Sequence, residues 1–185
     1  MRNNVAIDAA LVALIMGGLW YWLRSHNGAA FSGSRLTGYT AQVTPIIYEG
    51  VTPMNSEADW LARTIWGEAR GEGLVGMQAV ANVIMNRVRS SRFPSTVQGV
   101  VLAPWQFSMW NAGEPNGERA ANVTIADSNF KTAVDVANAA IAGGLSDLTG
   151  GALHYYANYI AAPSWAKTAS SQSAIGRHIF LVGVT

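Results

Sequence analysis

Residues 61–88 read LARTIWGEARGEGLVGMQAVANVIMNRV, and this stretch predicts two consecutive helices. Apolar side chains recur every three or four residues as far as Glu68, and the chain is almost continuously apolar from Val75 to Val88. Two glycines, Gly71 and Gly73, interrupt the pattern and mark the break between the helices.

The first helix is expected to begin near Ser56, because serine is a favoured N-cap residue and acidic side chains follow in the first turn. At about 100° per residue, Glu68 falls on the same face as Leu61, Thr64 and Ile65, which should be buried. Burial disfavours the charged form of a carboxyl group and raises its pKa. A general acid that works near neutral pH requires such a shift.

Periodicity alone leaves two interpretations of Glu68 open. The residue is either a catalytic acid or one half of a buried salt bridge with Arg63 or Arg87, and periodicity slightly favours the salt bridge. Glu72 lies one turn further along the same stripe, so these two carboxylates cannot flank both faces of a glycosidic bond. We expect Glu72 either to raise the pKa of Glu68 by repulsion or to be a solvated side chain.

The rest of the chain predicts a short helix after Pro94, a longer helix from Asn129 to Ile141, and β-type segments at Ala152–Ala157 and His178–Val182. Asp127 or Ser128 would cap the longer helix, and Gly143 and Gly144 would end it. The predicted fold class is α+β, with a mainly helical domain at residues 54–185 that ends in a short β-sheet or hairpin.

The N-terminal 53 residues divide into an apolar segment and a spacer. Residues 5–23 carry one charge, Asp8, and would form a helix roughly 30 Å long, enough to cross a bilayer. Residues 1–24 are therefore predicted to be a transmembrane signal-anchor helix, with a cleaved signal peptide as the alternative. Residues 25–53 are rich in Gly, Ser and Thr and predict a flexible spacer, with a short strand possible at Val43–Tyr48.

Composition excludes several classes of function. Only 12% of the 185 residues are charged and the net charge is +1, so no footprint for nucleic acid is visible. The chain has no cysteine, which removes thiolate nucleophiles and cysteine-based zinc sites. The three histidines, His26, His154 and His178, do not share a metal-binding spacing, so no metal or cofactor is expected.

A series of short motifs follows in order along the chain: LAR at 61–63, GEARGE at 67–72, AVANVIMNRV at 79–88, FP at 93–94, QGVV at 98–101, QFS at 106–108, GGA at 150–152 with Tyr155, PSWA at 163–166 and IGRHIF at 175–180. From about Asp59 to Leu181 this pattern resembles the SleB-like cell wall hydrolases, the catalytic domains of spore cortex-lytic enzymes. Each motif alone is a weak signal, and their shared order carries the resemblance. The first 55 residues show no peptidoglycan-binding repeat of the kind that accompanies this family.

The resemblance implies a lysozyme-like fold of the lytic transglycosylase type, with Glu68 as the catalytic acid. The implied substrate is the bond between N-acetylmuramic acid and N-acetylglucosamine in peptidoglycan. Glu68 would protonate the leaving oxygen and then take a proton from the C6 hydroxyl, which closes an anhydro ring. One carboxyl group suffices for both steps. A muramidase that uses water and a non-catalytic wall-binding or structural virion module remain the alternatives.

Tyr155 matches the family's tyrosine after the GGA turn and is the second candidate catalytic residue, with a core position as the alternative. On a strand, Tyr156 would point to the opposite face. The candidate substrate-binding residues are Gln106, Phe107, Ser108, Glu72 and Trp165. Among these we expect Phe107 to be buried packing, and His178 to be structural.

The predicted partners are the glycan strands of peptidoglycan and, through residues 5–23, a membrane. No nucleic-acid partner is expected. The enzyme domain would face the peptidoglycan as part of a single-pass membrane protein. Its setting would be either a bacterial envelope or a phage virion that opens the wall during entry or lysis.

Overall fold

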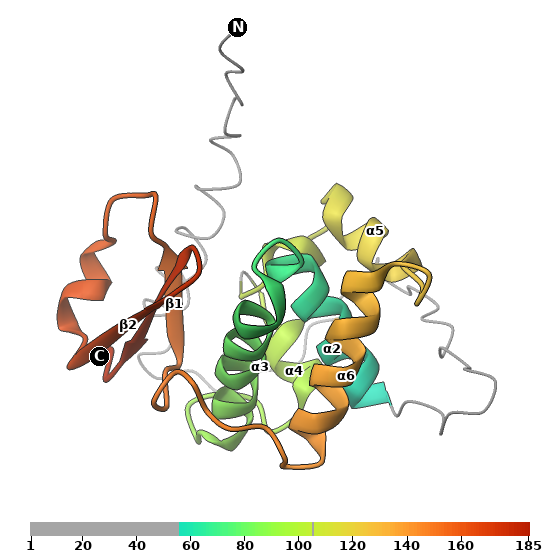
Figure 1. The fold of residues 1–185 in the computed structure, drawn as a ribbon. Coiled ribbons are helices and arrows are strands. Elements are labelled where there is room, and N and C mark those ends of the chain that lie inside the picture. The colour runs from blue at the N-terminus through green and yellow to red at the C-terminus, as the bar shows by residue number, and fades with distance from the viewer. Residues whose placement is uncertain (1–55, 105) are drawn as a thin grey trace, which may run out of the picture.

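The computed structural model describes residues 56–104 and 106–185. The helical part comprises α2 (Ser56–Ala69), α3 (Gly73–Arg89), α4 (Val97–Val101), the 3-10 turn η1 (Ser108–Trp110), α5 (Pro115–Asn122) and α6 (Ser128–Ile141). The C-terminal part comprises β1 (His154–Ala157), the 3-10 turn η2 (Ser164–Thr168), β2 (Ser171–Ile175) and β3 (His178–Val182). Figure 1 shows α2, α4 and α6 on one side of α3 and the small sheet on its other side.

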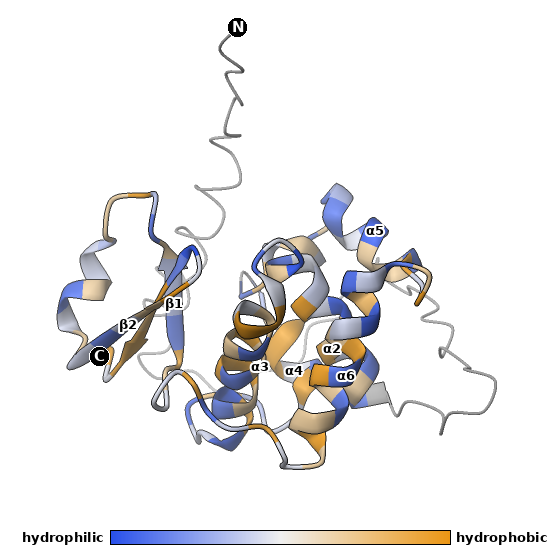
Figure 2. Ribbon diagram, viewed as in Figure 1, coloured by the Kyte–Doolittle hydropathy of each residue, from blue (hydrophilic) through white to orange (hydrophobic). Residues whose placement is uncertain are grey.

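The core lies between α2, α3 and α6. Leu61, Thr64 and Ile65 are fully buried on α2, as the helical periodicity predicts. Leu61 and Ile65 belong to the same hydrophobic cluster as Val80 of α3 and Phe130 of α6, and Figure 2 shows apolar residues on the facing sides of these helices. The C-terminal end of α2 is therefore held rigidly in the domain.

Local signals set the ends of α6. The Asp127 side chain accepts hydrogen bonds from the backbone N–H groups of Asn129 and Phe130 and so caps the first turn. At the other end, Gly143 has a φ of 75°, a conformation that favours glycine. Both ends agree with the sequence prediction.

The three strands form an antiparallel sheet in the order β1-β3-β2. Tyr155 of β1 pairs with Phe180 of β3, and Phe180 packs against Ala79 and Val83 of α3. Tyr156 lies on the opposite face with Leu181 and Val184, which confirms that the two tyrosines diverge. One face of the sheet is therefore directed toward the helices.

One α-helix, one strand and the two 3-10 turns η1 and η2 of the described residues were not predicted. Helix α5 is short and polar, and strand β2 carries mostly small polar side chains, so neither has a clear hydrophobic period. Strand β2 pairs along the whole of β3, and the predicted sheet or hairpin is therefore a three-stranded sheet. The predicted helices and strands that fall within residues 56–104 and 106–185 are confirmed, with ends shifted by up to two residues for α3 and β1.

The predicted membrane segment at residues 5–23, the spacer at residues 25–53 and the strand at Val43–Tyr48 lie outside the described residues. Within residues 56–104 and 106–185, none of the helices combines the length and apolar character needed to cross a membrane.

Candidate active site

The fold brings the two candidate catalytic residues together. Glu68 lies in the last turn of α2 and Tyr155 lies on β1, and 87 positions separate them in the sequence. The Tyr155 hydroxyl donates a hydrogen bond to Glu68 Oε2 at 3.1 Å. This bond joins the helical part of the domain to the inner face of the sheet.

The surroundings of Glu68 favour its protonated form. Although the residue as a whole is only partly buried, burial of its carboxyl group raises the pKa from 4.5 to about 7. The hydrogen bond from Tyr155 and the charges of Arg87 and Arg70 act in the opposite direction without cancelling this effect. Near pH 7 the group can therefore both donate and accept a proton.

The salt-bridge interpretation of Glu68 is wrong. Arg63 forms an ion pair with Asp59 at 3.0 Å and donates to the carbonyl of Ala120 at 2.6 Å. Arg87 donates through Nε to the carbonyl of Leu153 at 2.8 Å. Neither arginine forms an ion pair with Glu68 in the described part of the chain.

Tyr155 is held by aromatic neighbours from β3. Its ring lies edge-on to His178 at 5.1 Å between centroids and 5.5 Å from the ring of Phe180. Burial and the charge of Glu68 raise the pKa of Tyr155 well above its ordinary value, so the hydroxyl stays a neutral donor. Burial lowers the pKa of His178, which makes this residue a neutral support for the Tyr155 ring near pH 7.

Glu72 does not act on Glu68 as predicted. Its side chain accepts hydrogen bonds from the backbone N–H of Arg177 at 2.9 Å and from Arg177 Nε at 2.7 Å. Burial alone would raise the pKa of Glu72, but these bonds outweigh it and the pKa is lowered. Glu72 is thus neither a charge neighbour of Glu68 nor a solvated side chain, because it ties the α2–α3 turn to the β2–β3 turn.

The QFS motif leads into η1, which packs against the end of α2. Trp110 Nε1 donates to Thr64 Oγ1 at 3.0 Å, and a Cβ atom on Gly67 would overlap the thioether of Met109. A glycine next to Glu68 therefore permits the close approach of η1.

The three residues of the QFS motif differ in exposure. Phe107 is buried, as expected for packing, and lies beneath the guanidinium of Arg87. Ser108 is also buried, whereas Gln106 is half-buried and its Nε2 atom has no hydrogen-bond partner among the described residues. Gln106 thus carries an unsatisfied donor among the described residues, but this nitrogen atom is itself buried in the structure.

Trp165 does not join this site. It lies in η2, with its ring 6.2 Å from that of Tyr156 and 5.9 Å from that of His154. These residues occupy the face of the sheet opposite to Tyr155. A sugar bound beside Glu68 would therefore not be stacked on Trp165.

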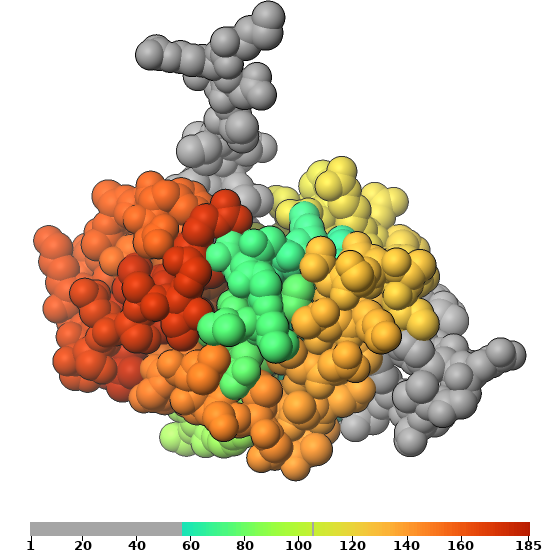
Figure 3. Space-filling view, in the orientation of Figure 1, coloured from blue at the N-terminus to red at the C-terminus, as the bar shows by residue number. Residues whose placement is uncertain are grey.

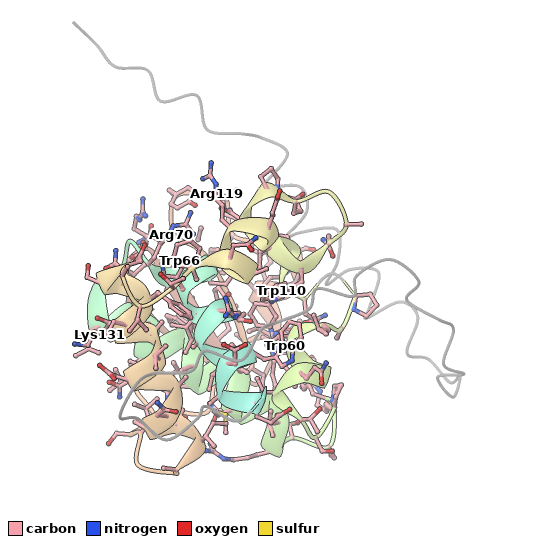
Figure 4. All side chains as sticks on the ribbon, turned by 90° about the vertical axis from the view of Figure 1, so that its right-hand side faces the viewer. Trp60, Trp66, Arg70, Trp110, Arg119 and Lys131 are labelled. Carbon is pink, nitrogen blue, oxygen red and sulfur yellow. The ribbon has the colours of Figure 1, made fainter. Side chains whose placement is uncertain are left out.

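Two arginines near Glu68 were not among the predicted site residues. Arg70 stacks on the ring of Trp66 at 4.6 Å and donates to the side chain of Asn116 at 3.2 Å, and Figure 4 shows the Arg70 and Trp66 side chains near Arg119. The other is Arg87, in the last turn of α3, which the sequence offered only as a possible salt-bridge partner of Glu68. Arg70 lies in the GEARGE motif and Arg87 in the AVANVIMNRV motif. These motifs were the signal in the sequence that could have marked the two arginines as site residues.

Comparison with known proteins identifies the family of this fold. The family model described as Cell Wall Hydrolase matches residues 71–181 and begins just after Glu68. The spore cortex-lytic enzyme of Bacillus cereus is 36% identical over 120 residues, which cover 65% of this chain and 42% of that protein. The spore cortex-lytic enzyme of Oceanobacillus iheyensis is 32% identical over 163 residues, which cover 85% of this chain and 53% of that protein. The chain thus spans about half the length of these relatives.

Two solved structures are similar along nearly their whole length. The catalytic domain of the Bacillus cereus SleB protein has a TM-score of 0.54 and 31% identity, with 78% of this chain and 98% of that chain covered. The catalytic domain of the germination-specific lytic transglycosylase SleB from Bacillus anthracis has a TM-score of 0.52 and 33% identity. The match covers 73% of this chain and 99% of that chain.

The fold thus defines a mainly helical catalytic domain of the type seen in enzymes that act on cell walls. The chain belongs to the Cell Wall Hydrolase family, in its SleB-like group of spore cortex-lytic enzyme catalytic domains. These relatives come from bacteria and do not support the phage alternative.

Proposed function

We propose that this protein cleaves the glycan strands of peptidoglycan between N-acetylmuramic acid and N-acetylglucosamine by lytic transglycosylation. The observation that carries the proposal is a carboxyl group with a pKa of about 7, hydrogen-bonded to a tyrosine at the end of a buried helix. Family membership and the similarity to a lytic transglycosylase support the substrate class. Since the family match begins at Gly71, the role of Glu68 rests on its geometry.

In the first step the protonated Glu68 donates its proton to the glycosidic oxygen. The bond from C1 of the muramic acid to that oxygen breaks, its electron pair stays on the oxygen, and an oxocarbenium-like centre develops at C1. Tyr155 remains neutral and donates to Glu68 Oε2, which orients the carboxyl group and stabilises the carboxylate it becomes.

In the second step the Glu68 carboxylate takes the proton of the muramic C6 hydroxyl while O6 attacks C1. The new C1–O6 bond closes the 1,6-anhydro ring, and Glu68 is protonated again without the uptake of water. The site needs only one carboxyl group for this cycle. Glu72, the acidic residue one turn away, is occupied by Arg177 and is not required.

The test is mass spectrometry of soluble fragments released from purified peptidoglycan by the full chain. The Glu68→Gln variant is the inactive comparison, and Glu118→Gln, an exposed change on α5, is the matched control. We expect anhydro-muramic ends from the unmodified protein and the control only. Reducing ends would replace the proposal by a muramidase that uses water. Absence of cleavage by all three proteins would instead leave a wall-binding or structural module.

We also propose that residues 5–23 anchor the protein in a membrane and that residues 25–53 let the catalytic domain reach the wall. The apolar length of the first segment and the composition of the second support this arrangement. The full chain should sediment with membranes after an alkaline carbonate wash, whereas a chain lacking residues 1–24 should be released. Release of the full chain by the wash would contradict an anchor.

A further inference from the structure

Arg87, in the last turn of α3, is a buried cation. The residue is 4% exposed, and its guanidinium carbon lies 5.2 Å from the centroid of the Phe93 ring and 5.4 Å from that of Phe107. Aromatic rings attract a guanidinium, but they replace only part of the hydration that burial removes. Burying the Arg87 charge therefore costs free energy that the two rings alone do not offset. This cost points to a further electrostatic role for the charge.

The hydrogen bonds of Arg87 point to the strand that carries Tyr155. Its Nε atom donates to the carbonyl of Leu153 at 2.8 Å, two residues before Tyr155. The adjacent Asn86 donates to the carbonyl of Ala152 at 3.3 Å. The end of α3 thus anchors the segment that enters β1, and it sets where the Tyr155 hydroxyl lies.

The bond to the Leu153 carbonyl uses only one of the hydrogen-bond donors of Arg87. Its Nη1 atom is buried and has no hydrogen-bond partner in the part of the chain that the structure describes. Burial lowers the pKa of Arg87 to about 10, so the guanidinium remains charged near neutral pH. The site therefore contains a fixed positive charge that no direct ion pair neutralises among the described residues.

The groups that interact with this charge come from two elements. Glu68 on α2 and Tyr155 on β1 both act on Arg87, and His154 on β1 is influenced by it in turn. The Glu68 carboxyl is also influenced by the hydrogen bond from Tyr155 and by the charge of Arg70, which lies in the turn directly after α2. In a poorly solvated interior such charges interact over distances longer than an ion pair.

We propose that Arg87 is a positioning residue of the Glu68 site. Its charge stabilises the carboxylate that Glu68 becomes after it donates its proton, and its bond to Leu153 fixes where Tyr155 meets that carboxylate. This inference rests on the proposed role of Glu68 as the catalytic acid. It also accounts for a buried guanidinium whose Nη1 donor is unused.

The test uses two substitutions that separate charge from hydrogen bonding. Arg87→Gln removes the charge and keeps an N–H donor, whereas Arg87→Lys keeps the charge. Arg119→Gln, an exposed change on α5, is the matched control. The pKa of Glu68 is measured in the full chain by carbon-13 NMR of its carboxyl group. The signal is assigned by its absence from Glu68→Gln, and thermal melting is recorded for every variant.

Arg87→Gln should raise the pKa of Glu68 by about one unit or more, since a nearby cation favours the charged form of a carboxyl group. Arg87→Lys and Arg119→Gln should leave that pKa nearly unchanged, although the lysine variant should melt at a lower temperature. Two results would overturn the proposal: an unchanged Glu68 pKa in Arg87→Gln, or an equal shift in Arg87→Lys. If Arg87→Gln does not fold, a shifted Glu68 pKa in Arg87→Lys, which keeps the charge, would still overturn the proposal.

The NMR titration also separates this inference from the proposed function. The pKa of Glu68 is read whether or not the protein cleaves peptidoglycan. An unmodified protein that fails to cleave would contradict the proposed function, while the comparison of the Arg87 variants would still report on the charge.

Discussion

Arg177 donates two hydrogen bonds to Glu72, from its backbone nitrogen at 2.9 Å and from Nε at 2.7 Å. These bonds connect the turn between β2 and β3 with the turn between α2 and α3, so they hold the inner face of the sheet near Glu68. The Arg177 side chain is 67% exposed and that of Glu72 only 7% exposed, so the contact lies where the two parts of the domain meet the surface. Figure 3 shows α3 reaching the surface between the sheet and α6 on this side of the molecule.

Glu72→Gln should leave most of the cleavage activity, because its carboxylate serves packing and not proton transfer. We expect a change in kcat/KM within about threefold and, because the ion pair is open to solvent on its Arg177 side, a melting temperature lower by about 2–4 °C at pH 7. Activity on purified peptidoglycan and thermal melting check both. If Glu72→Gln abolished cleavage while Glu68→Gln retained it, the two assigned roles would be reversed.

The effect of Glu72→Gln on melting should also depend on pH. A carboxyl group whose pKa is lowered in the folded state stabilises the fold above its ordinary pKa of 4.5, and this stabilisation is lost as the pH falls through the lowered value. The difference in melting temperature between the variant and the unmodified protein should therefore shrink in acid. A difference that is equally large at low pH would mean that the lost contact is not ionic.

Tyr155→Phe should reduce cleavage by about 10- to 100-fold, since a hydrogen bond to a charged group contributes roughly 1.5–3 kcal/mol. The same change removes an interaction that lowers the pKa of Glu68, so this pKa should rise further. Peptidoglycan turnover and NMR titration measure the two effects. Tyr156→Phe, on the opposite face of the sheet, should retain activity, and equal losses in both variants would point to the sheet and not to the hydroxyl.

Cleavage should decline as the pH rises above about 7, because only the protonated form of Glu68 can act as the general acid. The rate should approach a tenfold loss for each further pH unit. The turbidity of a cell-wall suspension, followed from acid to alkaline pH, gives this profile. An unrelated muralytic enzyme acting on the same suspension controls for effects of pH on the substrate. A rate that stays constant well above pH 7 would exclude Glu68 as the acid.

The sequence predicted those elements that carry strong local signals. The helices α2, α3 and α6 have clear apolar periods, and Asp127 marks the start of α6 as expected. Strand β2 has no such signal, because its pairing with β3 and not its own composition makes it a strand. Helix α5 is similarly polar and short, which is why it was missed.

The candidate site shows the same division between local and tertiary information. Helical periodicity placed Glu68 on the buried face of α2, and the family resemblance selected Tyr155 as its companion. The partner of Glu72 depends on a contact between residues 105 positions apart, and no local pattern contains it. Arg87 was considered only as a salt-bridge partner of Glu68, and its actual surroundings, the rings of Phe93 and Phe107, follow from tertiary packing.

Glu68→Gln should become more stable relative to the unmodified protein as the pH rises. Glu68 has a pKa of about 7 in the folded state and 4.5 as its ordinary value, so the folded state binds the proton more tightly. The associated stability is fully present below pH 4.5 and is lost as the pH rises through about 7. The neutral glutamine does not titrate, and its variant should therefore gain about 1–3 kcal/mol in relative free energy of unfolding across this range.

Urea denaturation of both proteins at several pH values measures this gain, with Glu118→Gln on exposed α5 as the control. The control should show no comparable change, since its carboxyl group is solvated in both states. A constant difference between Glu68→Gln and the unmodified protein from pH 4 to pH 8 would mean that the Glu68 carboxyl is not held in an environment that disfavours its charge. Because this measurement needs no substrate, it tests the origin of the proposed acid independently of cleavage.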